Sequence, residues 1–190
     1  LEEERKMSIY RYNSKGEEVL NYGNFKIVQP VIIRQTKTSV SSTTSRVAPS
    51  TVWTVAEDGK LFAGYGGNYQ IDVYGPDGKL SLNFGRAFTP IPDKSYRGEQ
   101  GQSKYMSAFV IITHWFFDED NNLWVEVFPK EYKEEIDTFI YDIFSPDGIY
   151  LNQAYVRHRI FHFKNGKAYS IVKTEAEFPV VKRFRLIKNN

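Results

Sequence analysis

The chain has 190 residues, a formal net charge of +2 and no cysteine, which excludes disulfides, thiolate catalysis and cysteine-based zinc sites. Basic and acidic residues are interleaved, so we expect no nucleic-acid surface. The length suits one domain with a sizeable core, the 16% aromatic content suits half-buried strands, and no apolar run approaches the ~18 residues of a transmembrane segment.

The sequence begins LEEERKMSIY, without an initiator Met or an apolar signal core. We therefore expect a processed chain or a piece of a longer one. A secretion signal or lipoprotein anchor ahead of Leu1 stays open, and a periplasmic or cell-surface location is favoured over a cytoplasmic one. The charged run Glu2 to Lys6 is expected to be a frayed end.

The first strands are expected in residues 8–23, with a turn at Ser14-Lys15-Gly16. Residues 25–35 are rich in β-formers but contain Pro30, which predicts an edge or connecting segment. Residues 36–50 are rich in Ser and Thr, which predicts a long surface loop. A partner-binding loop is the alternative for this segment.

Two hairpins follow in residues 51–85 and predict four consecutive antiparallel strands. The first turns at Asp58-Gly59, where both central residues are expected to have a positive φ. The second turns at Pro76-Asp77-Gly78. Residues 86–107 then predict a long loop, with a short helical turn near residues 94–99.

The same pattern of two hairpins recurs in residues 108–156, with turns at Asp120-Asn121-Asn122 and Pro146-Asp147-Gly148. One helical turn is expected between them, at residues 130–136. A third round in residues 158–187 turns at Asn165-Gly166 and ends after three strands. The segments IDVYGPDGKLSL and IYDIFSPDGIYL are nearly the same hairpin, which indicates an internal repeat.

A lone four-stranded meander leaves its faces uncovered, whereas stacking such sheets around an axis covers them. In TFIYDIF, large residues occupy both odd and even positions, so large side chains would project from both faces of the strand. A sheet that is buried on both faces requires this pattern. We predict an all-β fold of four-stranded antiparallel β-propeller blades in a partial ring of about three blades. The single domain, residues 1–190, would contain a partial blade (8–23), two blades (51–85 and 108–156) and a final incomplete blade (158–187).

The order of these hairpins resembles the C-terminal half of a bacterial six-bladed β-propeller of the NHL/TolB-like kind. The resemblance covers residues 51–187, with 8–23 as the end of a preceding blade; residues 36–50 depart from it. It implies that a strand from elsewhere completes the last blade, so we expect the partial ring to self-associate. The matching residues are Trp53, Asp58, Gly59, the turn Tyr74–Gly78, Phe117, Asp118, Asp120, Leu123, Trp124, Phe144, Pro146, Asp147 and Gly148.

Asp118, Asp120 and Asn122 alternate in FDEDNNLW, as oxygen ligands do at the start of a calcium loop. However, Leu123 stands where such a loop needs Gly, and Pro129 stands where it needs Glu. An ordinary β-turn rich in Asp and Asn explains the same letters and is favoured.

His158 and His162 are four residues apart on an expected strand and would share a face. With His114 they would offer the three imidazoles of a catalytic zinc site. Ile160 lies between them and no carboxylate is placed to orient them, so packed or surface histidines are favoured.

The remaining motifs do not indicate a phosphate-binding, nucleophilic or aromatic ligand site. The Gly-rich segment 64–68 opens no helix, so no phosphate loop is expected, and no Gly-x-Ser-x-Gly is present. Trp53, Trp115 and Trp124 are expected in the blade core rather than in a sugar or peptide site.

The leading interpretation is a non-enzymatic binding or scaffold module without catalytic residues or cofactor. It would recognise a protein or an extended ligand through the rim loops 36–50 and 86–107. The alternative is a propeller hydrolase or lactonase with a metal, calcium, in the channel; the acidic and amide set of the calcium-dependent lactonases finds no match here. A surface-anchored lipoprotein is a third class.

Overall fold

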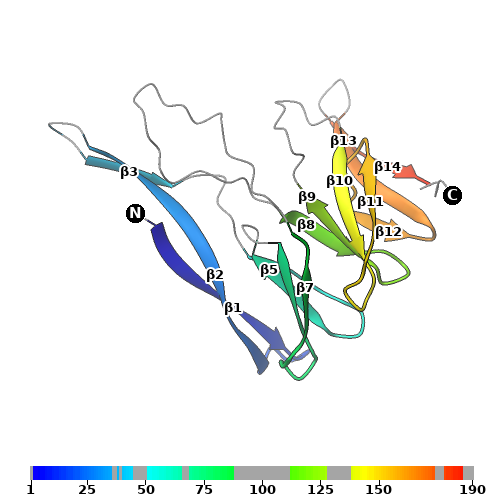
Figure 1. Ribbon diagram of the computed structural model, residues 1–190, viewed down its shortest axis with the longest axis horizontal. Helices are drawn as coiled ribbons and strands as arrows, with labels where there is room; N and C mark the ends of the chain where they lie inside the picture. The colour runs from blue at the N-terminus through cyan, green and yellow to red at the C-terminus, as the bar shows by residue number, and fades with distance from the viewer. Residues whose placement is uncertain are drawn as a thin grey trace. The chain divides into compact units, whose positions relative to one another are not determined.

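The computed structural model describes residues 2–35, 38, 40–44, 51–65, 69–87, 112–127, 138–173 and 178–185. This part of the chain contains no helix; its fourteen strands form four antiparallel sheets, two of four strands and two of three (Figure 1). The all-β fold of blade-like meanders is therefore confirmed. Within the described ranges, no helix has the length and apolar character of a membrane span. The chain divides into two compact units, Leu1–Ile112 and Thr113–Asn190, and each is described by itself.

The first sheet of the first unit differs from what the sequence predicts. Its order is β1-β2-β3, formed by β1 (Glu2–Tyr12), β2 (Glu18–Gln35) and β3 (Val40–Thr44). The frayed end predicted at Glu2–Lys6 is wrong, because these residues pair with β2. The uninterrupted loop predicted for residues 36–50 is wrong at β3; residues 45–50 lie outside the described part.

Pro30 explains how one long strand serves two neighbours. Residues up to Pro30 pair with β1, and residues from Val31 onward pair with β3. The proline lies where β2 changes partner, so its missing N–H interrupts neither ladder internally. The prediction that residues 25–35 form an edge or connector is wrong, since β2 is the middle strand of the sheet.

The second sheet of the first unit is the predicted meander, in the order β4-β5-β6-β7. Its core includes the fully buried Leu61 and Ile71. The β1–β2 hairpin packs on this sheet, because Ile9 and Tyr22 join Leu61 and Ala63 in one apolar cluster. The strands are β4 (Thr51–Val55), β5 (Leu61–Tyr65), β6 (Gln70–Tyr74) and β7 (Leu80–Gly85).

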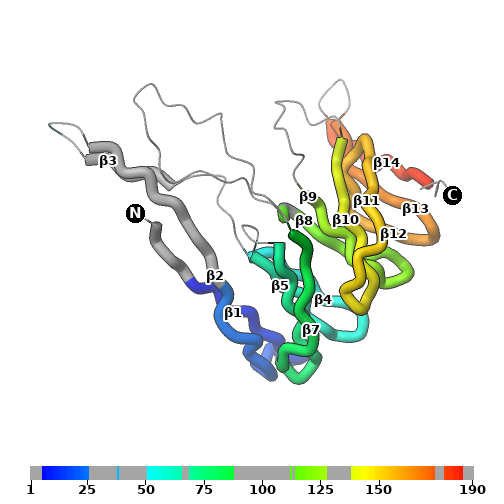
Figure 2. Tube along the Cα trace, viewed as in Figure 1, coloured from blue at the N-terminus to red at the C-terminus, as the bar shows by residue number. Residues whose placement is uncertain are grey.

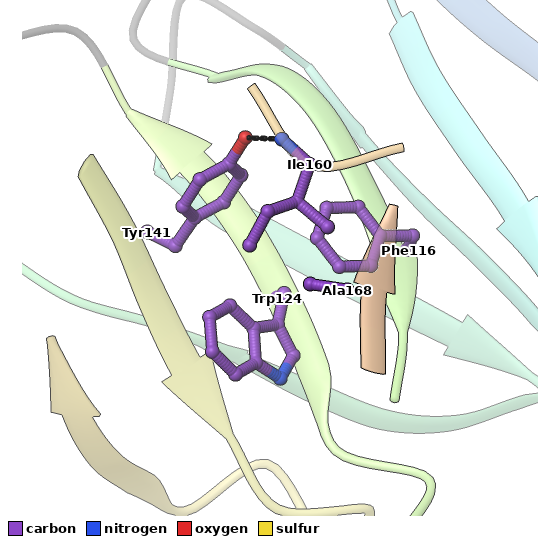
Figure 3. Packing of buried hydrophobic residues seen from close by; sticks show 5 residues of the cluster. All are labelled: Phe116, Trp124, Tyr141, Ile160 and Ala168. Atoms are coloured by element: carbon purple, nitrogen blue, oxygen red, sulfur yellow. Dashed lines mark hydrogen bonds between the residues drawn. The ribbon is translucent and has the colours of Figure 1, made fainter. Parts of the chain in front are cut away.

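The second unit contains a four-stranded and a three-stranded sheet, in the orders β11-β10-β9-β8 and β12-β13-β14, as Figure 2 traces. A core of Phe116, Trp124, Tyr141, Ile160 and Ala168 joins the two sheets (Figure 3). Its strands are β8 (Ile112–Phe117), β9 (Leu123–Val127), β10 (Phe139–Phe144), β11 (Tyr150–Val156), β12 (His162–Lys164), β13 (Lys167–Lys173) and β14 (Pro179–Phe184).

Five of the hairpin turns share one geometry. In each, the first residue's N–H donates to the carbonyl of the fifth (2.8–3.0 Å), and the fourth residue's N–H donates to the carbonyl of the first (2.9–3.1 Å). The fourth residue has φ between 59° and 82°. This is a type I turn followed by a left-handed residue. The turns are Asn13–Glu17, Ala56–Lys60, Gly75–Lys79, Asp118–Asn122 and Ser145–Ile149.

One turn prediction is therefore corrected. At Asp58-Gly59 only Gly59 has a positive φ, because the loop has three residues rather than two. The tight two-residue turn with both φ positive occurs instead at Asn165-Gly166. The helical turns predicted at residues 94–99 and 130–136 lie outside the described residues, as does the predicted loop from residue 88 onward.

The turn glycines give a matched test of backbone and packing costs. A Cβ at Gly16 would meet nothing within 4 Å, whereas one at Gly78 would lie 2.9 Å from Cδ1 of Leu20, with the same positive φ. We expect Gly16→Ala to lower the free energy of unfolding by about 1–2 kcal/mol through the left-handed backbone alone. Gly78→Ala should cost about 1 kcal/mol more through overpacking.

Urea unfolding of both variants, with and without Leu20→Ala, measures the difference. The extra cost at Gly78 should vanish in the Leu20→Ala background, while the cost at Gly16 should not change. Equal costs for the two glycine variants in the wild-type background would contradict the packing argument.

Candidate functional site

A group of ionisable side chains, two buried and one partly exposed, lies in the second unit where β9, β10 and the segment after β11 meet. The Nε of Arg159 donates to Oε2 of Glu126 at 2.7 Å, and the hydroxyl of Tyr141 donates to the same oxygen at 3.3 Å. The backbone N–H of Ile160 donates to the Tyr141 hydroxyl oxygen at 2.9 Å (Figure 3). Glu126 is only 8% exposed, and Tyr141 is fully buried.

The register of the sheet places these groups together. Glu126 and Tyr141 are direct partners across β9 and β10, so their side chains project from the same face. Trp124, two residues before Glu126, lies on that face and belongs to the core between the two sheets. A carboxylate on such a face is tolerated only when it is paired and hydrogen-bonded, as Glu126 is.

His114 of β8 lies beside this group. Its ring centroid is 6.0 Å from that of Phe161 and 5.7 Å from that of Phe116. Burial lowers the pKa of His114, and the positive charge of Arg159 lowers it further, against an opposing effect of Glu126. The imidazole is therefore neutral at pH 7. Its Nε2 is buried without a hydrogen-bond partner in the described part of the chain.

The Tyr141 hydroxyl acts as a fixed hydrogen-bonding group. Burial and then the charge of Glu126 raise the pKa of Tyr141, so the phenol stays protonated. It donates to Glu126 and accepts from Ile160, which uses its donor and one acceptor position. The arrangement therefore ties the backbone of residues 157–161 to the sheet.

The predicted calcium-loop residues are brought together, but as a turn. The Asp118 carboxylate accepts hydrogen bonds from the backbone N–H of Asp120 (3.0 Å) and of Asn122 (2.9 Å). It also accepts from the Asn122 side chain (3.1 Å) and from Nε1 of Trp124 (2.8 Å). In the described residues, no group of three or more His, Asp or Glu side chains is arranged to hold a metal ion.

The predicted histidine pair does not share a strand. His158 precedes β12, which begins at His162. His158 stacks on Phe184 with centroids 5.3 Å apart, whereas His162 lies against Tyr169. The prediction fails because hydrogen bonds to Tyr141 and Glu126, rather than a strand ladder, hold the segment before β12.

The three tryptophans have different surroundings. Trp115 and Trp124 are buried, as a core position requires, but Trp53 is 49% exposed. The core position predicted for Trp53 is therefore wrong, because Trp53 lies on the outward-facing side of the edge strand β4. In the Gly-rich segment, Gly64 and Tyr65 end β5, and residues 66–68 lie outside the described part.

Glu126, Tyr141 and Arg159 were not predicted as functional residues from the sequence. One signal was available: LWVEV places a carboxylate inside a strand expected to be buried on both faces, and all five of its residues are buried. A charged residue in such a strand requires a partner. The sequence offered no means of choosing Arg159, which lies 33 residues further along. The chain matches no known family model and no curated protein sequence.

Tyr141→Phe tests the tie between the sheet and residues 157–161. The change leaves the buried N–H of Ile160 without its acceptor, which should lower the free energy of unfolding by about 1–3 kcal/mol. Tyr155→Phe is the matched control, because the hydroxyl of Tyr155 makes only an exposed hydrogen bond. Chemical unfolding followed by fluorescence measures both. A loss at Tyr141 no larger than that at Tyr155 would show that the tie does not stabilise the unit.

His114 should make stability depend on pH. The folded pKa lies below the unfolded value near 6.5, so the unfolded chain binds the proton first. Stability is therefore complete above about pH 6.5 and falls as the pH drops from there toward the folded pKa. We expect His114→Gln to flatten this slope between pH 7 and 5, measured by urea unfolding. Identical slopes in the wild-type protein and the variant would contradict the assignment.

Proposed function

We propose that this chain is a non-enzymatic β-propeller-type binding module of the NHL/TolB-like kind. It serves as a rigid repeat scaffold that recognises another protein or an extended ligand through its rim loops, with the partial ring completed by self-association. The supporting observation is that two acidic side chains, the predicted calcium-loop residue Asp118 and the buried Glu126, are engaged in hydrogen bonds that hold the fold. Asp118 accepts three hydrogen bonds within its turn and a fourth from Trp124 of β9, and Glu126 binds both Arg159 and Tyr141.

The repeated turns also support a scaffold role. Five turns of one geometry hold successive strands in a fixed register, with side chains reinforcing them. Asn13 and Asp118 at the first position, and Asp58 and Asp77 at the third, each accept hydrogen bonds from turn N–H groups. Rigid frames of this kind commonly present binding loops. The fold alone does not specify what is bound.

One observation favours the alternative function, a hydrolase or lactonase. His114 is neutral and lies near Glu126, and its Nε2 has no hydrogen-bond partner within the described residues. Calorimetric titration of the full chain with Ca²⁺ distinguishes the two functions. For the binding module we expect no one-to-one binding tighter than about 10 µM, the weaker limit of sensor-type calcium sites. Stoichiometric binding that Asp118→Asn abolishes would favour the hydrolase.

Site-specific photo-crosslinking tests recognition through the loops. A photoreactive residue at Tyr96, within the loop predicted from the sequence at residues 86–107, should give one discrete adduct in extracts of cells that produce the protein, and the same residue at Lys15 should give none. Excess unlabelled chain should compete, whereas a chain with residues 88–107 replaced by a Gly/Ser linker should not. Equal labelling from both positions would contradict loop recognition. A strict monomer at micromolar concentration in analytical ultracentrifugation would contradict self-association.

A further inference from the structure

A small pocket lies in the second unit between the end of β11 and the end of β14. It is lined by Val156, Arg157, His158, Ile160 and Phe184 and has a volume of about 180 Å³. Val156 and Phe184 pack against the apolar core of the unit, and Ile160 is part of it. The pocket therefore has an apolar floor that continues the core.

The rim of the pocket carries an available positive charge. Arg157 and Arg159 flank His158, but they differ in their contacts. Arg159 is paired with Glu126, whereas Arg157 is exposed and has no ion-pair or hydrogen-bond partner within the described part of the chain. The guanidinium of Arg157 therefore has its donors free for a ligand at the pocket mouth.

The pocket wall is held in place before any ligand arrives. The segment between β11 and β12 is fixed by the hydrogen bonds of Arg159 to Glu126 and of Ile160 to Tyr141. The N–H of Phe161 also donates to the carbonyl of Tyr169 at 2.9 Å. His158 stacks on Phe184 with an interplanar angle of 20°. A preformed wall avoids the entropy cost of ordering on binding.

Size and charge together indicate the ligand. An engineered apolar cavity of about 150 Å³ holds benzene, so about 180 Å³ accommodates one six-membered ring. Drug-sized sites begin at about 300 Å³, so a nucleotide-sized cofactor does not fit. The stacked pair of Phe184 and His158 adds aromatic side chains to the pocket lining, against which a ligand ring can pack. A guanidinium binds a carboxylate through two parallel hydrogen bonds.

We infer that this pocket binds an aromatic ring that bears a carboxylate on a short aliphatic chain, with the ring on the floor and the carboxylate on Arg157. Two sources share this chemistry: a free aromatic acid, or the C-terminal aromatic residue of a peptide. The site goes beyond the proposed function, because it uses neither rim loop and does not depend on self-association.

NMR titration of the full chain with 3-phenylpropanoate tests the site. We expect saturable amide shifts confined to residues 156–160 and 184, with a dissociation constant of roughly 1 mM, as a ligand of this size gives. 3-Phenylpropanol and 3-phenylpropylamine lack the carboxylate and should bind at least about tenfold more weakly, since a charge-assisted hydrogen bond contributes about this much. Propanoate keeps the carboxylate but lacks the ring, and should also bind at least about tenfold more weakly because it buries little apolar surface.

Two variants separate Arg157 from a general charge effect. Arg157→Gln, at an exposed position, should fold normally and weaken 3-phenylpropanoate binding about tenfold. Lys164→Gln removes an exposed cation from the same unit and should leave binding unchanged. Absence of saturation at 20-fold excess over the expected constant, shifts outside these residues, equal binding of the amine, or unchanged binding by Arg157→Gln would each overturn the inference.

A peptide comparison distinguishes the two sources. The probes are acetyl-Gly-Gly-Phe with a free C-terminal carboxylate and the same peptide with a C-terminal amide. If the acid peptide binds more than tenfold tighter than 3-phenylpropanoate, and the amide does not, the natural ligand is a peptide C-terminus. If the acid peptide binds no tighter than 3-phenylpropanoate, the ligand is a free aromatic acid. Failure of the loop crosslinking with success here would reject the rim-loop function and retain the pocket.

Discussion

The hydrogen bond from the Ile160 N–H to the Tyr141 hydroxyl connects the packing of the second unit to its surface. Tyr141 is buried between two sheets, where its phenol stays protonated, donates a hydrogen bond to Glu126 and accepts this bond from Ile160. The backbone of residues 157–160, ahead of the β12–β13 ladder, is thereby held by side chains of the neighbouring sheet. The wall of the pocket therefore depends on a buried hydroxyl, whose loss is costly because it leaves the N–H of Ile160 unpaired in the interior.

A second polar contact joins the two sheets of this unit at their turns. The Glu119 carboxylate accepts hydrogen bonds from the backbone N–H groups of Asn165 and Gly166, the latter at 2.6 Å. Both of those residues have positive φ, so their N–H groups are directed together toward one anion. Trp124 and Phe163, with centroids 5.0 Å apart, pack in the interior between the same hairpins. Apolar burial and a carboxylate–turn contact therefore oppose separation of the sheets at two places.

Local chemistry was predictable and distant pairing was not. Turn motifs such as Pro-Asp-Gly and the alternation of aromatic with polar residues identified the strands from β4 to β14. Both signals depend only on residues that are adjacent in the sequence. The strand β3 was missed, because Ser and Thr can form either a loop or a strand and the pairing with residues 31–35 decides. Trp53 was misplaced for a related reason, since its exposure depends on which face of β4 is covered, and the letters of β4 alone do not determine this. The contact of Glu126 with Arg159 joins residues 33 apart, a distance at which no spacing rule applies.

The repeat itself shows where the second unit departs from its own pattern. In the first unit, Leu61 pairs with Tyr74, and three residues along the ladder Gly64 pairs with Ile71. In the second unit, Leu123 pairs with Phe144, and at the same ladder step Glu126 pairs with Tyr141. The pair Gly64 and Ile71, which has no polar side chain, is thus replaced in the second unit by the carboxylate of Glu126 and the phenol of Tyr141. The first unit forms the same ladder without these two polar groups. Since burying a carboxylate is unfavourable by itself, its presence is explained by what it holds, the segment with Arg159 and Ile160 that forms the pocket wall.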